Sequence, residues 1–356
     1  MIGALLSLFL ALQAVSPDAL QHMQAGAEAE KKGHFDVAIA EFRKLTELEP
    51  NVAEGFVSLG QAYLENHDYG QAIPSLKQAL KLSPDLLPAH QLLGYALLAQ
   101  GYAAEAISHL EKGEDSAALG IAQLEAGRLP DAVTNLQVAL AKNPSDPDLL
   151  YYFGRASGLL SKQSIDTLIA NYPDSARAHQ AMAENYYVLR QMPQAEKEFQ
   201  EAIRLRPDLP KVHLELGLVY ATASQWPQAE EAFRAETKLQ PGLAEAAYRL
   251  GDAMLQQGKV REARVELARS NKLLPEMPET LYSLGKAASL EGDAVSAEKD
   301  WKKVIELEKA TSLAAKAHFA LAGLYRKQGK AEEAAREMRE FKKLQSTAAP
   351  TEGSRQ

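Results

Sequence analysis

The chain has 356 residues, of which 46% are hydrophobic and 24% are charged, and its formal net charge is −8. These proportions are ordinary for a folded protein, and the acidic balance argues against a general nucleic-acid binder. The chain contains no cysteine, which excludes disulfide frameworks, thiolate zinc sites and cysteine nucleophiles.

An apolar run occupies residues 2–15 and ends at the polar sequence that starts with Ser16. It is shorter than the ~20 apolar residues of a bilayer-spanning helix. Its length fits the apolar region of a secretory signal peptide, with cleavage after Ala14, although no Lys or Arg precedes it. We therefore expect export, to the periplasm of a bacterium or to the outside. An uncleaved membrane anchor and a capping helix of a cytoplasmic protein are the alternatives.

Residues 176–277 repeat one pattern three times, with a period of about 34 residues. The columns of this pattern are a small residue, an alanine, a large apolar residue and a proline. They contain Ala183, Gly217 and Gly251, then Ala195, Ala229 and Ala263, then Phe199, Phe233 and Leu267, then Pro207, Pro241 and Pro275. A fixed period of this length is the signature of stacked helical hairpins.

The residue types in these columns have physical reasons. A small residue where two helices cross lets them approach closely, and a large side chain then fills the space beside it. A proline after the second helix cannot continue it and so ends the repeat. Pro130, Pro193 and Pro227 instead fall where we predict second helices to start, a position where a missing backbone donor costs little.

Taken in chain order, the pattern predicts ten repeats of two helices each. Repeats one to three occupy residues 16–112. Repeats four and five, in residues 113–175, are irregular. The step from Ala106 to Ala132 is shorter than one period, so we expect a helix about two turns short there.

The fifth repeat keeps its first helix but has a degenerate second helix. No alanine occupies the expected column, and Pro144 and Pro173 lie closer together than one period. Repeats six to ten cover residues 176–345 and end in a charged capping helix over residues 331–344. We expect the polar tail, residues 346–356, to be disordered.

These columns resemble the tetratricopeptide repeat (TPR) family, whose pattern is well represented in the second repeat by Leu59, Gly60, Tyr63, Ala72 and Pro84. The resemblance covers almost the whole chain after the apolar run. It implies an all-α fold, a right-handed α–α superhelical solenoid of about ten TPR helix-turn-helix repeats.

Candidate chemistry is weak. Five of the eight histidines share one column, four residues before the small residue: His22, His90, His179, His213 and His318. Repeats stack ~10 Å apart, whereas metal ligands lie ~2.1 Å from one ion, so we interpret this column as structural. Residues 323–330 resemble a phosphate-binding loop only in their final Gly-Lys. We predict no catalytic residue, no metal, no cofactor and no enzyme activity.

The resemblance also implies a concave face lined by the first helix of each repeat. Positions three before and one and four after the small residue would line this face. Aromatic and large apolar residues on an exposed face mark protein-binding sites. The predicted partner-binding groove consists of Tyr151, Tyr187, Leu214, Leu218, Tyr248, Tyr282 and Phe319. The alternative is that these side chains pack sideways on a neighbouring helix and are hidden.

We therefore predict a non-enzymatic scaffold or adaptor that binds an amphipathic helix or an extended apolar peptide of a partner protein. An alternative is a recognition or regulatory subunit of a cell-envelope enzyme or of a polysaccharide secretion or assembly complex. We expect no nucleic-acid partner, and membrane contact only through an uncleaved leader. The basic residues between Lys316 and Lys343 fit a solvated cap, or contact with an acidic partner or an anionic membrane surface.

Overall fold

A computed structural model describes residues 16–348, which form 19 α-helices and contain no strand. This confirms the predicted all-α superhelical repeat fold. The chain divides into two compact units, one up to Ser164 and one from Ile165. The predicted leader, residues 1–15, lies outside the described residues, as do residues 349–356. Within residues 16–348, no helix has the length and apolarity that crossing a membrane requires.

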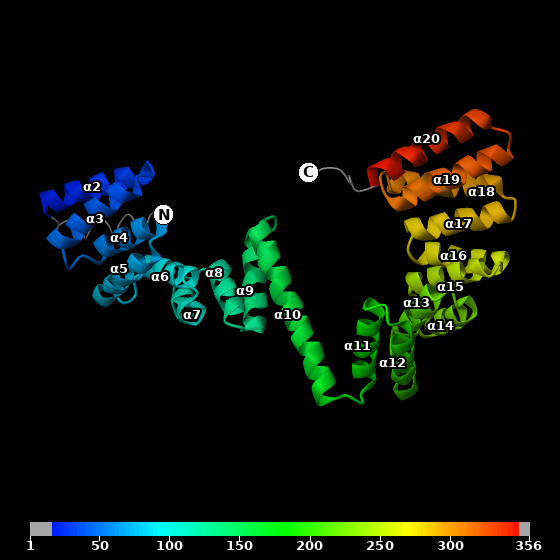
Figure 1. Ribbon diagram of the computed structural model, residues 1–356, viewed down its shortest axis with the longest axis horizontal. Coiled ribbons are helices and arrows are strands. Elements are labelled where there is room, and N and C mark those ends of the chain that lie inside the picture. Colours follow the sequence, from blue (N-terminus) through cyan, green and yellow to red (C-terminus); the bar gives the residue numbers. More distant parts are fainter. Residues whose placement is uncertain (1–15, 349–356) are drawn as a thin grey trace, which may run out of the picture. The chain divides into compact units, whose positions relative to one another are not determined.

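Unit 1 contains four helix pairs and the first part of a longer helix (Figure 1). Its helices are α2 (Pro17–Lys31), α3 (Phe35–Leu48), α4 (Ala53–Glu65), α5 (Tyr69–Leu82), α6 (Leu87–Ala99), α7 (Ala103–Lys112), α8 (Ser116–Glu125), α9 (Leu129–Lys142) and α10 (Pro147–Asn171). From α2 to α9 each helix packs against the next, and the first helices α4, α6 and α8 also contact one another in sequence. The first helices therefore form one face of the unit.

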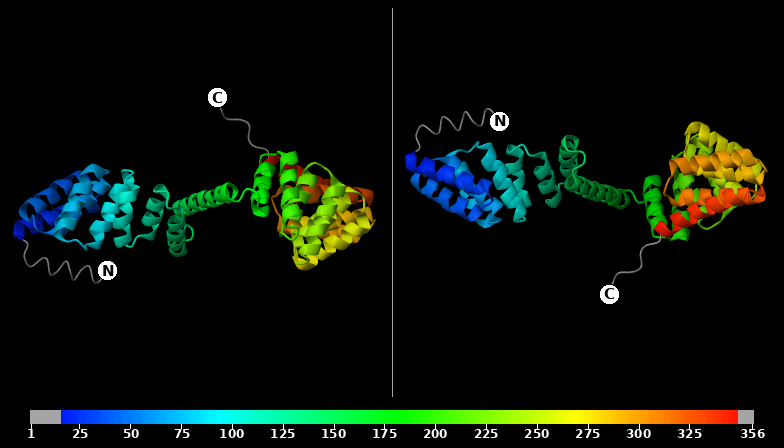
Figure 2. Two further views of the ribbon diagram at one scale, coloured as in Figure 1. Left: turned by 90° about the horizontal axis from the view of Figure 1, so that it is seen from below. Right: turned by 90° about the horizontal axis from the view of Figure 1, so that it is seen from above.

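Unit 2 contains five helix pairs stacked in chain order, which Figure 2 shows from two further sides. Its helices are α11 (Ala176–Val188), α12 (Met192–Leu205), α13 (Val212–Thr222), α14 (Trp226–Leu239), α15 (Ala244–Gln256), α16 (Val260–Leu273), α17 (Pro278–Leu290), α18 (Ala294–Leu307), α19 (Ser312–Lys327) and α20 (Ala331–Ala348). The first helices contact one another here too, α11 with α13, α15 with α17, and α17 with α19.

The small-residue column lies where the two helices of a repeat cross. A Cβ atom on Gly26 would lie 2.6 Å from the Phe42 ring, and one on Gly285 would lie 2.6 Å from Trp301. Both large residues follow their glycine by 16 positions and are buried. The close approach that the sequence pattern predicts is therefore present, because a side chain at either glycine would overlap with the facing ring.

The turn between the two helices of a repeat uses a left-handed backbone residue seven positions after the small-residue column. Six of these residues are glycine, for which a positive φ costs little. The turn residues are Gly33, His67, Gly101, Gly127, Arg190, Ser224, Gly258, Gly292 and Gly329. This turn occurs in every repeat except the fifth.

The fifth repeat is a single helix instead of the predicted pair. Its turn position is Ser161, which lies inside the 25-residue α10. The regular pattern is interrupted in this segment, since Pro144 and Pro173 are closer in sequence than the regular period of about 34 residues. The prediction of ten helix pairs is therefore wrong at this repeat, and the described residues contain nine pairs and one long helix.

Two other predicted boundaries also differ. The shortening near residues 113–115 is shared by α7 and α8, which have 10 residues each, instead of falling on one helix. The capping helix α20 continues to Ala348, four residues beyond its predicted end. Residues 346–348 are thus helical, although we expected the disordered tail to begin there.

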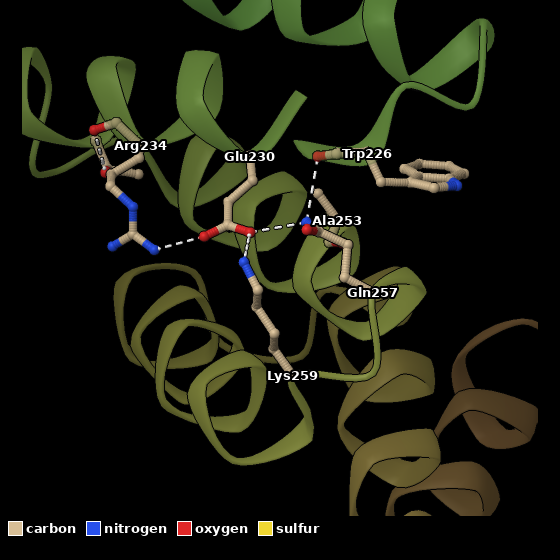
Figure 3. A network of polar contacts seen from close by, with 7 residues as sticks. Trp226, Glu230, Arg234, Ala253, Gln257 and Lys259 are labelled. Atoms are coloured by element: carbon tan, nitrogen blue, oxygen red, sulfur yellow. Dashed lines mark hydrogen bonds and ion pairs between the residues drawn. The ribbon is translucent and has the colours of Figure 1, made fainter. Parts of the chain in front are cut away.

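Polar contacts join neighbouring repeats in unit 2 at two sites, one period apart. At the first site the second helix supplies the acid, and at the other it supplies the base. The buried carboxylate of Glu230 on α14 accepts hydrogen bonds from Lys259 at 2.6 Å, Gln257 at 2.7 Å and Arg234 at 2.8 Å (Figure 3). Although burial alone raises it, the bonds from Lys259 and Arg234 hold the pKa of Glu230 below its ordinary value.

In the next repeat the second helix supplies the cation. The guanidinium of Arg264 on α16 donates to Glu291 at 2.6 Å and to Asp293 at 2.8 Å. These partners lie 27 and 29 positions after Arg264, the same separations that join Glu230 to Gln257 and Lys259. Each contact joins a second helix to the turn of the following repeat.

Candidate partner-binding surfaces

The predicted groove residues belong to both units. Tyr151 lies on α10 in unit 1 and its side chain is 62% exposed. The other six lie on first helices of unit 2, and their side chains differ widely in exposure. Leu214 is only 4% exposed and is part of a hydrophobic core with Phe233 and Leu250. Its assignment to an exposed groove is therefore wrong, because it packs sideways between neighbouring helices.

Four of the predicted residues are half-buried, and each packs against a core cluster with part of its side chain accessible: Tyr187, Leu218, Tyr248 and Tyr282. Phe319 is 54% exposed, and its ring centroid lies 5.1 Å from that of Phe341 on α20. The face of unit 2 thus presents the edges of aromatic rings whose other edges belong to the core.

Asp252 lies on this face and was not among the predicted residues. Burial raises the pKa of Tyr248 to about 12, and the negative charge of Asp252 contributes to this rise. The guanidinium carbon of Arg249 lies 5.2 Å from the centroid of the Tyr248 ring. The charged residues near Tyr248, Asp252 and Arg249, could not be found by a search for apolar and aromatic residues.

An acidic site that sequence reasoning also missed joins the first helices α11 and α13. The amide nitrogen of Gln180 donates to Glu184 at 2.9 Å and to Glu215 at 3.2 Å. Arg177 donates to the amide oxygen of Gln180 at 2.6 Å, which orients the amide. Burial raises the pKa of Glu215 to about 7, and the neighbouring charge of Glu184 adds to the shift.

Unit 1 has a cavity of about 590 Å³ on the face of its first helices. Its lining is mainly aromatic and apolar and comes from α6, α7, α8 and α10. The lining residues are Tyr95, Leu98, Ala99, Gly101, Ala103, Ile121, Glu125 and Tyr152. Three of them, Tyr95, Leu98 and Ile121, stand in the rows that define the predicted groove, but the apolar pattern alone favours the later repeats.

The hydroxyl of Tyr95 is fully engaged within the protein. It donates a hydrogen bond to Asp115 and accepts one from the amide of Gln91 at 2.9 Å. Asp115 also caps the start of α8 by accepting hydrogen bonds from the backbone nitrogens of Ala117 and Ala118. Burial and the contact with Asp115 raise the pKa of Tyr95 to about 12. Tyr95 therefore offers the cavity a fixed ring and no free hydroxyl.

Glu125 is the charged residue of the lining. Its carboxylate accepts a hydrogen bond from Arg155 on α10 at 2.8 Å, and both side chains are more than 40% exposed. An exposed ion pair of this kind contributes little to stability and exchanges partners at small cost. The carboxylate at the cavity is thus available to another cation.

The histidine column makes contacts within its own repeats. His22, His179 and His318 each place Nδ1 2.5–2.7 Å from a glutamate 19 positions later, on the second helix. His90 instead contacts His109, also 19 positions later, at 2.8 Å. These contacts tie the two helices of a repeat together. Among residues 16–348, no group of three or more His, Asp or Glu side chains is arranged to hold a metal.

Comparison with known proteins identifies the repeat. A family model described as tetratricopeptide repeat matches residues 63–123, and a second model with that description matches residues 23–86, 117–157 and 214–272. No curated protein matches the chain in sequence.

The following three solved structures have a similar arrangement of helices. MamA (residues 41–end) from Desulfovibrio magneticus RS-1 is 19% identical, with a TM-score of 0.46, over 50% of this chain and 98% of that one. YrrB, titled a TPR protein with an unusual peptide-binding site, is 17% identical, with a TM-score of 0.44, over 52% and 93%. A structure of the APC/C hetero-tetramer Cut9–Hcn1 is 14% identical, with a TM-score of 0.45, over 93% and 88%.

Proposed function

Because the chain belongs to the tetratricopeptide repeat family, we propose that it is a protein-interaction scaffold whose first-helix faces bind a peptide or a helix of a partner protein. Helical-repeat proteins use such extended faces for binding. The cavity of unit 1 carries the proposal, since a concave site with aromatic walls and few polar groups is typical of a binding site.

The face of unit 2 gives additional support. Half-buried rings such as Tyr248 and Tyr282 lose little side-chain entropy when they contact a partner, because the core already holds one side of each ring. Their alanine variants would lose core contacts as well as groove contacts. Charged substitutions at Leu218 or Ile121 instead place a charge on the face itself, and because both side chains also pack against a core cluster, thermal unfolding must verify that each variant is folded.

The experiment is capture of partners by the full chain from cells of its source. Leu218→Arg and Ile121→Arg place a charge on the first-helix faces of unit 2 and unit 1. The matched controls are Val265→Arg on α16 and Val138→Arg on α9, whose side chains are exposed on second helices. We expect at least one first-helix variant to lose partners that both controls retain. Loss with the controls and retention with the first-helix variants would contradict the proposal.

We further propose that the protein is exported and acts in the bacterial envelope or outside the cell. The apolar run of residues 2–15 supports this, with cleavage expected after Ala14. Amino-terminal sequencing of the protein from its source cells tests it. Loss of about fourteen residues is expected, and an intact terminus in the cytoplasmic fraction would contradict it.

A further inference from the structure

The net charge of the protein is confined to one unit. Residues up to Ser164 include 19 Asp and Glu but only 11 Lys and Arg, whereas residues from Ile165 include 28 of each. Unit 1 therefore carries the whole net charge of −8, and unit 2 is balanced. A net negative charge on unit 1 attracts positively charged partners to that unit and raises their rate of association.

Part of this negative charge lies along the first helices of unit 1. Glu30, Glu65 and Glu125 stand four or five positions after the small-residue column of α2, α4 and α8. Burial raises the pKa of Glu30, and the charge of Glu65 adds to the effect. The Oε1 atom of Glu30 is buried without a hydrogen-bond partner among the described residues. A carboxylate in this state gains a favourable interaction from any cation that approaches it.

The cavity beside Glu125 selects for an apolar group. Its walls are the rings of Tyr95 and Tyr152 and the side chains of Leu98 and Ile121. The Tyr95 hydroxyl is satisfied by Asp115 and Gln91, so it has no hydrogen bond left for a polar ligand. Away from the Glu125 carboxylate, the walls are mainly apolar, and an apolar side chain that enters gains by leaving water.

From the cavity and the charge together, we infer that unit 1 binds a cationic amphipathic segment of a partner protein. A large apolar side chain of that segment enters the cavity, and a neighbouring Lys or Arg replaces Arg155 on the Glu125 carboxylate. This inference rests on the proposed function and names the chemistry of the partner for unit 1. An acidic segment, a nucleic acid or an anionic lipid surface would meet the repulsion of a unit with charge −8.

The role of Arg155 makes the inference specific. In the structure Arg155 satisfies Glu125 from within the chain, and the two lie on different helices, α10 and α8. Removing Arg155 should leave Glu125 free for the partner, while removing the charge of Glu125 should leave the partner's cation without its acceptor. Two neutral substitutions at one ion pair thus act in opposite directions on binding.

The test is selection of a displayed library of short random peptides on the full chain, followed by affinity measurement of individual peptides. We expect a class of peptides that carries a net positive charge and at least one large apolar residue. This class should lose at least about tenfold in affinity with Ile121→Arg and keep its affinity with Leu218→Arg, the corresponding position in unit 2. Thermal unfolding of each variant verifies that it is folded.

At the ion pair, Glu125→Gln should weaken these peptides about two- to fivefold, and Arg155→Gln should strengthen them by a similar factor. The inference is overturned if peptides that depend on Ile121 are neutral or acidic, if no selected peptide depends on Ile121, or if both ion-pair variants shift affinity in the same direction. Peptides that depend on Leu218 would show in each of these cases that the proposed function holds while the inference for unit 1 fails. A selection with no peptide sensitive to either variant would count against both.

Discussion

Gly217 and Gly154 occupy the same column of the repeat but have different surroundings. A Cβ atom on Gly217 would overlap with the buried ring of Phe233, whereas one on Gly154 would meet no atom within 4 Å. We predict that Gly217→Ala lowers the free energy of unfolding by about 1–2 kcal/mol through overpacking. Gly154→Ala should raise it by about 0.5–1 kcal/mol, because alanine is the better helix former. Urea unfolding measures both, and equal signs would contradict the assignment of the column.

Glu215 makes the stability of unit 2 depend on pH. Its folded-state pKa of about 7 lies above the ordinary value of 4.5, so the folded protein holds this proton more tightly than the unfolded chain does. The stabilisation is therefore complete below about pH 4.5 and is lost as the pH rises through about 7. We predict that Glu215→Gln, which imitates the protonated form, removes about 1–2 kcal/mol of this dependence.

Urea unfolding at pH 5 and pH 8 measures this effect. The wild type should lose stability between the two values by more than the variant does. Glu279→Gln, an exposed position on α17, serves as the control and should leave the difference unchanged. A pH dependence that is the same in wild type and Glu215→Gln would show that this carboxyl group is not responsible.

At the scale of single residues, the sequence predicts the contacts that form within one repeat. Gly217 and Phe233 meet because both lie in the same helical hairpin, at a separation that every repeat preserves. The burial of Leu214 could not be predicted in this way. Side chains of its column range from 4% exposed at Leu214 to 62% exposed at Tyr151, so the column alone does not determine burial.

At the scale of elements, the contacts of Glu230 and Arg264 show how repeats recognise their neighbours. The two sites carry opposite charges on the second helix. If they were interchanged, Glu230 would face the acidic turn at Glu291, and Arg264 would face the basic turn at Lys259. We predict a favourable coupling energy of about 0.5–1.5 kcal/mol in a double-mutant cycle of Glu230→Gln and Lys259→Gln. The exposed pair Arg128–Asp131 is the control and should give about 0.3 kcal/mol. A coupling no larger than that of the control would contradict a role in joining the repeats.

Helix α10 marks the limit of prediction for elements. All nine helix pairs of the described residues have a left-handed turn residue seven positions after the small-residue column. This short, regular turn makes the pairs predictable. In the fifth repeat, Ser161 takes that position and lies closer to Pro173 than a turn residue normally lies to its exit proline. A degenerate second helix and a continuous helix have almost the same sequence pattern. The length of the segment does not separate them either, because the fourth repeat forms a helix pair within residues 116–142.

At the scale of the whole molecule, the described residues form two stacks of helix pairs, one with a net negative charge and one with balanced charge. The helical repeat itself could be predicted from the period of about 34 residues. The position of the cavity could not, since it depends on the spacing of α6, α8 and α10 and on the hydrogen bonds that hold Tyr95. The predicted groove therefore emphasised the tyrosines of unit 2 and omitted the cavity of unit 1.

Hydrogen–deuterium exchange of the full chain, alone and saturated with a selected peptide, tests the central claim that partners bind to the first-helix faces. A peptide that depends on Ile121 should slow exchange in α6 and α8 and leave α5 and α9 unchanged. A peptide that depends on Leu218 should slow exchange in α13 and α15 and leave α14 and α16 unchanged. Protection confined to the second helices would contradict the account.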